Sequence, residues 1–326
     1  MSKYLKHHTG GLLMPTAQTE NLDKFHNPLT TAKGDERAFV DLKNLDTLWF
    51  NTGTVCNLNC SNCYIESSPE NDRLVYLTVE DVTPYINEIE EQNLNTQEIA
   101  FTGGEPFTNP NFVKILDFVL SKGFKALVLT NAYRMMNRYK DELSQLNKTY
   151  SDKLFLRVSL DHHKEEVHNK ERGEGTFQAT LKNIKWLEDN NFNCSIAGRS
   201  LLNESLDESK NGYNNTLKLF GINNINTQDP AQLTVFPEMS EDLSIPEITT
   251  DCWGILNKNP DQMMCAKTRM IVKRKGQSNT TVLPCTLIAY DENFDLGHNL
   301  KDSQKRVPLN HRFCAQFCVL GGASCS

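Results

Sequence analysis

The stretch Cys56-Asn-Leu-Asn-Cys60-Ser-Asn-Cys63-Tyr64 places three cysteines in one short loop with the spacing C-x3-C-x2-C. It follows Leu48-Trp49-Phe50, which we predict to open a buried strand. Three thiolates can hold three irons of a cubane 4Fe–4S cluster and leave the fourth iron without a protein ligand. An open metal position is typical of catalysis, whereas a closed four-ligand site is usually structural. Zinc is the alternative, but it takes four ligands, and no fourth cysteine is adjacent.

From residue 46 onward, apolar strands alternate with helical segments of about 10–15 residues, which is typical of βαβ units in a parallel sheet. Six such units favour an open, partial (β/α)6 TIM-like barrel over a closed eight-fold one. In such a barrel the chemistry gathers at the carboxyl ends of the strands. The strands are expected at residues 48–50, 98–101, 126–129, 154–160, 194–197 and 233–236, and the helices at 78–89, 111–121, 136–146, 177–190 and 204–220.

The second predicted strand ends in Phe101-Thr-Gly-Gly-Glu-Pro106. Gly103 and Gly104 would let the backbone approach a ligand closely, and Glu105 can accept hydrogen bonds from an ammonium group. Alone, this sequence fits any tight strand-to-helix turn. The third and fourth strands end near Asn131 and Ser159, so small polar groups are expected at the same rim.

Together, the cysteine loop and the Gly-Gly-Glu sequence resemble the signature of the radical S-adenosylmethionine (SAM) superfamily. The resemblance implies that SAM chelates the open iron, and that its reductive cleavage yields a 5′-deoxyadenosyl radical that abstracts hydrogen from a substrate. The run from Ser159 through Gly175-Thr-Phe177 resembles the branch with additional C-terminal clusters. By resemblance, the cofactor-binding residues are Gly103, Gly104, Glu105, Pro106, Asn131, Ser159, Arg172 and Ile196.

Some residues of this region have two interpretations. Ile196 either packs on the adenine of SAM or is a plain core residue. Glu238, after the sixth strand, is either a substrate-facing acid or a rim charge. We expect the three histidines after Asp161 to be surface residues of a polar loop, namely His162, His163 and His168.

Six further cysteines lie beyond residue 250. Predicted strands at 268–273 and 280–283 form a hairpin whose ends carry Cys265 and Cys285, and these two therefore come close in space. Cys314 and Cys318, spaced C-x3-C, can supply two more thiolates from one loop or helical turn, which makes four ligands for one closed cluster. Cys194 stands apart and is expected to be a small core residue.

The C-terminal arrangement resembles the SPASM and twitch extensions of radical SAM enzymes, which carry auxiliary 4Fe–4S clusters. The full SPASM cysteine run is missing, and six cysteines cannot fully ligate two cubanes, so a single auxiliary cluster is expected. Whether Cys318 or Cys325 is its fourth ligand is left open, as is the role of Cys252. A zinc ion held by four cysteines is the alternative.

Composition restricts the remaining possibilities. The 326 residues carry a net charge of −7, which argues against nucleic acid or anionic membrane as a partner. The sequence has no transmembrane segment and no signal-peptide core, so a cytoplasmic location is expected, where ten cysteines point to metal or redox chemistry rather than disulfides. We divide the chain into an N-terminal extension (1–45), the radical SAM core barrel (46–240) and an auxiliary cluster domain (241–326) with a hairpin and a helix.

The predicted function is a radical SAM enzyme that oxidises or cross-links an organic substrate and receives electrons from a donor such as a flavodoxin or ferredoxin. The 45-residue N-terminal extension is too short for a leader-binding domain, which favours a small molecule over a peptide as substrate. A peptide-modifying maturase is the alternative. A non-catalytic metal-binding scaffold is the rival from another class, and the complete cysteine and Gly-Gly-Glu sequences argue against it.

Overall fold

A computed structural model describes residues 24–239 and 245–323. Its centre is one eight-stranded sheet in the order β7-β6-β5-β4-β3-β2-β8-β9, in which every neighbouring pair is parallel except the β8–β9 hairpin. The predicted six-stranded partial barrel is confirmed. The strands are β2 (Thr47–Asn51), β3 (Glu98–Thr102), β4 (Lys125–Thr130), β5 (Leu154–Ser159), β6 (Asn193–Arg199), β7 (Leu233–Phe236), β8 (Thr268–Val272) and β9 (Thr281–Leu283).

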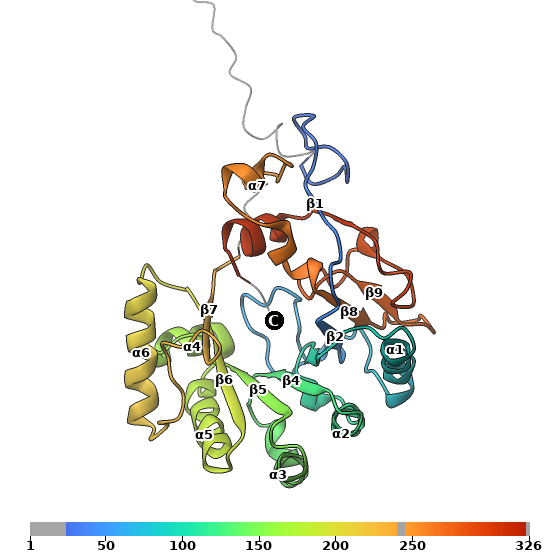
Figure 1. Ribbon diagram of the computed structural model, residues 1–326. Coiled ribbons are helices and arrows are strands. Elements are labelled where there is room, and N and C mark those ends of the chain that lie inside the picture. Colours follow the sequence, from blue (N-terminus) through green and yellow to red (C-terminus); the bar gives the residue numbers. More distant parts are fainter. Residues whose placement is uncertain (1–23, 240–244, 324–326) are drawn as a thin grey trace, which may run out of the picture.

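Helices connect successive parallel strands and cover the outer face of the curved sheet (Figure 1). They are α1 (Val79–Glu91), α2 (Phe112–Ser121), α3 (Lys140–Thr149), α4 (Glu165–Arg172), α5 (Thr176–Asp189) and α6 (Leu206–Leu219), with the short α7 (Cys252–Ile255) after β7. A capping box of Thr78 and Asp81 starts α1. Ser205 and Glu208 form a second one at α6.

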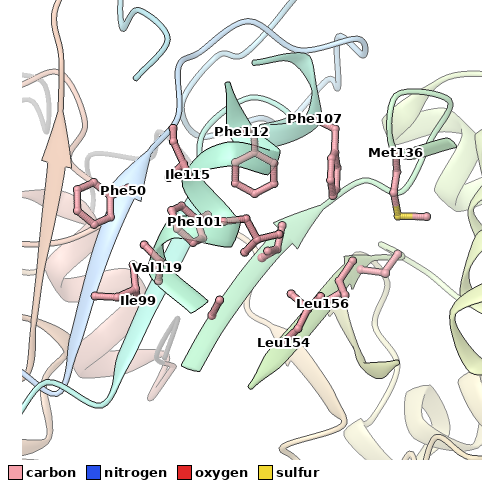
Figure 2. Close-up of a cluster of buried hydrophobic side chains, with 14 of the residues drawn as sticks. Phe50, Ile99, Phe101, Phe107, Phe112, Ile115, Val119, Met136, Leu154 and Leu156 are labelled. Carbon is pink, nitrogen blue, oxygen red and sulfur yellow. The ribbon is translucent and has the colours of Figure 1, made fainter. Parts of the chain in front are cut away.

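The two faces of the sheet belong to two apolar clusters because successive side chains of a strand point to opposite faces. Phe50, Ile99 and Phe101 face outward and pack against the helices. Figure 2 shows this cluster, in which the ring of Phe112 meets Phe101 and Phe107 edge-on at 5.4 and 5.1 Å. The alternate residues Trp49 and Ala100 face the barrel interior and join the cluster that contains the C-terminal cysteines.

The C-terminal segment is built onto the barrel. Strand β8 pairs in parallel with β2, so the predicted hairpin extends the barrel sheet. Residues 24–45 run along the same segment, where β1 (Phe39–Val40) pairs with β10 (Val307–Pro308), and the ion pair of Arg37 with Glu247 is almost fully buried. Figure 1 shows the blue N-terminal and red C-terminal segments side by side above the sheet. No helix in the described ranges is long and apolar enough to cross a membrane.

The prediction of a polar surface loop with three exposed histidines is wrong. The segment contains α4, and His162 and His168 are buried. His168 packs edge-on against Phe177, and its Nδ1 accepts a hydrogen bond from the backbone N–H of Asp161. The ring of His163 stacks on His162 and lies over Gly212, where a Cβ would come within 2.5 Å of it. These rings escaped prediction because a polar segment was assumed to be solvated.

The buried His168 predicts a pH dependence of stability. Burial, together with the neighbouring Arg172 guanidinium, lowers its pKa to about 4. Between the unfolded pKa of about 6.5 and this value, the unfolded chain binds the additional proton, so stability falls as the pH falls. We expect His168 to account for about 2 kcal/mol of lost stability between pH 7 and pH 5. Denaturant unfolding of iron-stripped protein measures this loss.

His168→Gln should flatten that part of the pH profile, whereas His26→Gln at an exposed position should leave it unchanged. An identical pH slope in wild type and His168→Gln would show that the ring is protonated as readily in the folded chain as in the unfolded one.

Candidate functional site

The three closely spaced cysteines lie at the carboxyl end of β2 and line a cavity of about 610 Å³. Two backbone N–H groups are directed at their sulfurs: that of Leu58 lies 3.4 Å from Cys56 Sγ, and that of Ser67 lies 3.3 Å from Cys63 Sγ. Such donors stabilise thiolates, which are the form that binds metal. The residues present therefore fit a thiolate-held iron–sulfur cluster that faces the cavity.

The cysteine loop is fixed from two sides. Asn71 holds its return segment through Nδ2, which donates to Glu66 O at 2.8 Å. Tyr290, from the C-terminal segment, donates its hydroxyl to Ile65 O at 2.7 Å, and the guanidinium of Arg73 lies 3.7 Å from the centre of its ring. A residue that follows Cys285 by five positions thus braces the loop that carries Cys63.

Gly103 and Gly104 line the cavity, but the close approach that they permit is between two parts of the chain. Gly104 N donates to Gly53 O at 2.8 Å. A Cβ on Gly104 would lie 2.3 Å from Val55 O, and one on Gly103 would lie 2.4 Å from Gly53 O. Gly103 also has a φ of +136°, which disfavours any side chain. The sequence predicts that these glycines make room for a ligand. In the structure they first make room for the cysteine loop.

Glu105 is buried behind the cavity wall and is absent from the residues that line the cavity. Its carboxylate accepts hydrogen bonds from Asn131 N at 2.7 Å and from Thr130 Oγ1 at 2.9 Å, and so ties the end of β3 to the end of β4. Burial raises its pKa to about 7. Pro106 begins the 3-10 turn that follows. A contact of Glu105 with the SAM ammonium group stays a prediction.

The remaining predicted SAM contacts divide into two groups. Asn131, Ser159 and Arg172 line the cavity, and Asn131 Nδ2 lies 3.7 Å from Cys56 Sγ. Ile196 is fully buried in the outer core instead, while its strand neighbour Ala197 lines the cavity. The placement favours the core interpretation of Ile196.

A charged network that the sequence interpretation had not assembled lies beside Cys60. Arg172 donates to both carboxylate oxygens of Asp161, at 2.7 and 2.8 Å. Burial opposes ionisation of Asp161, but the neighbouring guanidinium of Arg172 holds the pKa of this carboxyl below its usual range. Arg199 pairs with Glu171 and Glu238, so Glu238 is part of a rim ion pair. The signal for Arg199 was its position just after the fifth predicted strand, at the end of β6 and next to the rim.

The C-terminal cysteines converge as predicted. A small cavity of about 20 Å³ is lined by Cys265, Cys285, Cys314 and Cys318, the last two from one π-helical segment (Cys314–Leu320). Burial raises the pKa of Cys265 to about 11. Cys252 lies apart, near Thr249, and Cys325 lies outside the described residues. Cys194 packs against the outer core.

The spacing of the sulfurs bears on which metal fits. A zinc ion with Zn–S bonds of about 2.3 Å brings its sulfurs to about 3.8 Å from one another. Within residues 24–239 and 245–323, the one group of three or more ligand atoms that all lie within 4.8 Å is His162, His163 and Glu204. In this arrangement of the described residues, neither cysteine set holds three ligand atoms within that distance, so the sulfurs would have to move closer together to bind a single zinc ion.

The His162–His163–Glu204 group is better described as a small network of ion pairs, which Lys164 joins. Nδ1 of His162 accepts a hydrogen bond from Lys164 N at 3.0 Å, which places the proton of the neutral ring on Nε2, the atom that faces Glu204. Lys164 Nζ donates to the same carboxylate at 2.6 Å. A metal would have to displace the proton on Nε2 and compete with Lys164 for the carboxylate.

Comparisons with known proteins agree with this geometry. The family model of the radical SAM superfamily matches residues 50–208. The antilisterial bacteriocin subtilosin biosynthesis protein AlbA of Bacillus subtilis is 40% identical over 143 residues, which cover 44% of this chain and 30% of AlbA. The mycofactocin maturase MftC of Mycolicibacterium smegmatis is 24% identical over 153 residues, 47% of this chain and 37% of MftC. The chain thus matches well under half of the length of either relative.

Among solved structures, SuiB of Streptococcus suis bound to the precursor peptide SuiA is similar to this chain, with a TM-score of 0.58 and 15% identity over 81% of this chain and 66% of SuiB. The structure of anSMEcpe with bound AdoMet gives a TM-score of 0.54 and 16% identity, with 82% of both chains covered. At these identities the likeness establishes the fold alone.

The packing of Gly104 generates a prediction. Gly104→Ala places a methyl group against the carbonyl of Val55, one residue before Cys56, and the loop must shift. We expect the variant to lose the iron held at Cys56, Cys60 and Cys63 on anaerobic reconstitution, and to melt at a lower temperature. Iron counting and a melting curve measure both.

Gly254→Ala is the matched control, because a Cβ at this helical position meets no atom within 4 Å and alanine favours the helix. It should retain all of its iron and its melting temperature. Full iron loading in Gly104→Ala would show that the loop tolerates the displacement.

Proposed function

Because the chain belongs to the radical SAM superfamily, we propose that it cleaves SAM reductively and uses the radical so formed to remove hydrogen from a substrate. The observation that carries the proposal is the cavity at the carboxyl ends of the strands, which is lined by Cys56, Cys60 and Cys63 on one wall and by Gly103 and Gly104 next to them. When bound, a 4Fe–4S cluster and SAM supply a one-electron cleavage of the C5′–S bond and a 5′-deoxyadenosyl radical.

The residues of this chain would bind and orient these groups. The three thiolates would hold the cluster so that one iron faces the cavity. Asn131 and Ser159, at the ends of β4 and β5, offer hydrogen bonds to the polar parts of SAM. Arg172 is anchored by Asp161 in a bidentate ion pair and presents a fixed positive charge at the wall, where a carboxylate would be favoured.

The C-terminal segment also lines the cavity. It contributes an apolar wall of Leu287, Ile288, Phe313 and Phe317, where Phe236 of β7 packs on Phe317 with ring centres 5.4 Å apart, and its polar lining residues are Tyr290, Asp291, His311 and Arg312. The apolar part would exclude water from a reactive radical, and the charged groups could orient a polar part of the substrate.

A peptide is the substrate that we now favour, in place of the small molecule expected from the sequence. The longest matches are to a bacteriocin biosynthesis protein and a maturase, and one similar structure was solved with a precursor peptide. The earlier preference rested on the shortness of residues 1–45, and most of that segment lies outside the described residues. The matched segments cover only a minor share of those relatives, so their activity cannot simply be transferred to this chain. Peptide modification is therefore part of the proposal.

The four converging C-terminal cysteines support a second, auxiliary 4Fe–4S cluster with all its irons ligated by Cys265, Cys285, Cys314 and Cys318. Its place directly behind the apolar wall, with Cys285 two residues from the cavity-lining Leu287, suits a role in taking up the electron left on an oxidised substrate. A reduced flavodoxin or ferredoxin in the cytoplasm would supply electrons to the first cluster. Nine free cysteines in the described part of the chain accord with such a reducing compartment.

The central test removes the open cluster. We expect reconstituted protein to carry about eight irons and to convert SAM to 5′-deoxyadenosine and methionine under dithionite. Replacing Cys56, Cys60 and Cys63 by Ala should abolish this reaction and leave about four irons. Cys194→Ala is the control, since Cys194 lies in the outer core. Undiminished SAM cleavage in the triple variant would contradict the assignment, and one zinc with no iron would contradict the auxiliary cluster alone.

The peptide proposal is tested by co-production with short peptides encoded beside this gene, followed by mass spectrometry. Oxidation or cross-linking removes two hydrogens, so a modified peptide is lighter by their mass. Cys285→Ala should still cleave SAM without coupling to a substrate, but the peptide should stay unmodified. A melting curve for this variant separates loss of turnover from unfolding of the segment. Turnover of a small molecule with every peptide left intact would overturn the peptide assignment.

A further inference from the structure

Arg269 is the second residue of β8, fully buried and opposite Leu48 of β2. Its guanidinium makes four hydrogen bonds, all to backbone carbonyls. Nη1 donates to Cys265 O at 2.7 Å and to Thr268 O at 2.8 Å, while Nε and Nη2 donate to Ser303 O and Lys305 O. These bonds satisfy the donors, but carbonyl oxygens carry no net charge to balance that of the arginine.

Two other arginines with buried guanidinium groups each have a carboxylate partner. Arg37 pairs with Glu247, and Arg172 pairs with Asp161. Among the residues that the structure describes, no Asp or Glu oxygen lies within the 4.0 Å of Arg269 that defines an ion pair. An isolated buried cation costs several kcal/mol unless a negative charge compensates it. Without a compensating charge, Arg269 would therefore lower the stability of the fold. It occupies a position where an apolar side chain would normally pack.

The guanidinium contacts the cysteine site directly, since Nη1 donates to the carbonyl of Cys265 at 2.7 Å, and the side chains of Cys265 and Cys285 are the ionisable groups whose charge would favour its cationic form. Both thiols belong to the set of four that lines the small C-terminal cavity. As thiols they are neutral, but metal coordination deprotonates them, and a metal ion bound by four thiolates carries a net negative charge. Binding at that site would therefore supply the missing counter-charge.

We propose that Arg269 is the counter-charge of the metal–thiolate site at Cys265, Cys285, Cys314 and Cys318, and that it sets the reduction potential of the cluster held there. The inference rests on the auxiliary cluster of the proposed function. A fixed cation beside a cluster stabilises the reduced state, which is more negative by one charge, more than the oxidised state. Arg269 therefore keeps this cluster easier to reduce, as an acceptor of an electron from the substrate requires.

The experiment uses the full chain with Cys56, Cys60 and Cys63 replaced by Ala, so that the auxiliary cluster is the iron–sulfur centre that is titrated. Arg269→Gln removes the charge and keeps hydrogen-bond donors. At a fixed potential we expect the ratio of reduced to oxidised cluster, read by EPR, to fall about tenfold, which corresponds to a midpoint lower by about 59 mV for one electron. Arg269→Lys should restore most of the ratio, because it restores the charge.

Arg37→Gln is the matched control: it also removes a buried guanidinium bonded to backbone carbonyls, but one that already has Glu247 as its partner. It should lower the melting temperature and leave the potential unchanged. An Arg269→Gln potential equal to wild type, with iron retained, overturns the counter-charge while the auxiliary cluster stands. Absence of iron in the triple-cysteine background overturns the auxiliary cluster itself.

If Arg269→Gln incorporates too little iron for a redox titration, a stability measurement tests the proposal instead. Melting temperatures of wild type and Arg269→Met are compared in the iron-loaded and the chelator-stripped states. If the cluster is the counter-charge, the substitution must destabilise the loaded protein more than the stripped one, where the arginine is an uncompensated charge. Equal destabilisation in both states would mean that Arg269 serves only to bind the four carbonyls, and the proposal would fail.

Discussion

The double pairing of β2 is the constraint on which the rest of the structure depends. This strand pairs in parallel with β3 on one edge and with β8 on the other. Its carboxyl end carries the cysteine loop, β3 carries the two glycines that pack under that loop, and β8 carries Arg269 beside the second set of cysteines. Because hydrogen-bonded strands lie about 4.8 Å apart, the sheet holds the segments that lead into the two cysteine sets close together.

A second connection between the sites passes through side chains. Tyr290 follows Cys285 closely in the chain, and its hydroxyl holds the carbonyl of Ile65, two residues after Cys63. Asn71 donates to the same hydroxyl at 3.2 Å, and Arg73 covers the ring. An ordered C-terminal segment thus stabilises the loop of the first site. The two sites share one packed wall, so loss of metal at one site should loosen the packing at the other.

The sequence was sufficient for the order of strands and helices, because periodicity, caps and the repeated βαβ alternation are local signals. It was also sufficient for the grouping of the cysteines, since a hairpin between Cys265 and Cys285 forces them together. It failed where a residue acts through distant contacts. The polar segment after Asp161 contains a helix with buried histidines, and the glycines of the Gly-Gly-Glu sequence are needed against Val55 and Gly53. Neither the pairing of β8 with β2 nor the isolation of Arg269 has a local signature.

The buried polar groups of the barrel rim show how the site is prepared before any ligand binds. Asp161 is paired with Arg172, so its charge is compensated within the chain, and the buried Glu105 has its hydrogen bonds satisfied by Thr130 and Asn131. At the C-terminal site the compensation is incomplete, since Arg269 has only carbonyl partners and the thiols around it are neutral without metal. Under the proposal for Arg269, the C-terminal segment reaches charge balance when metal is bound. Metal binding there would then stabilise the segment whose Tyr290 holds the loop after Cys63 through the carbonyl of Ile65.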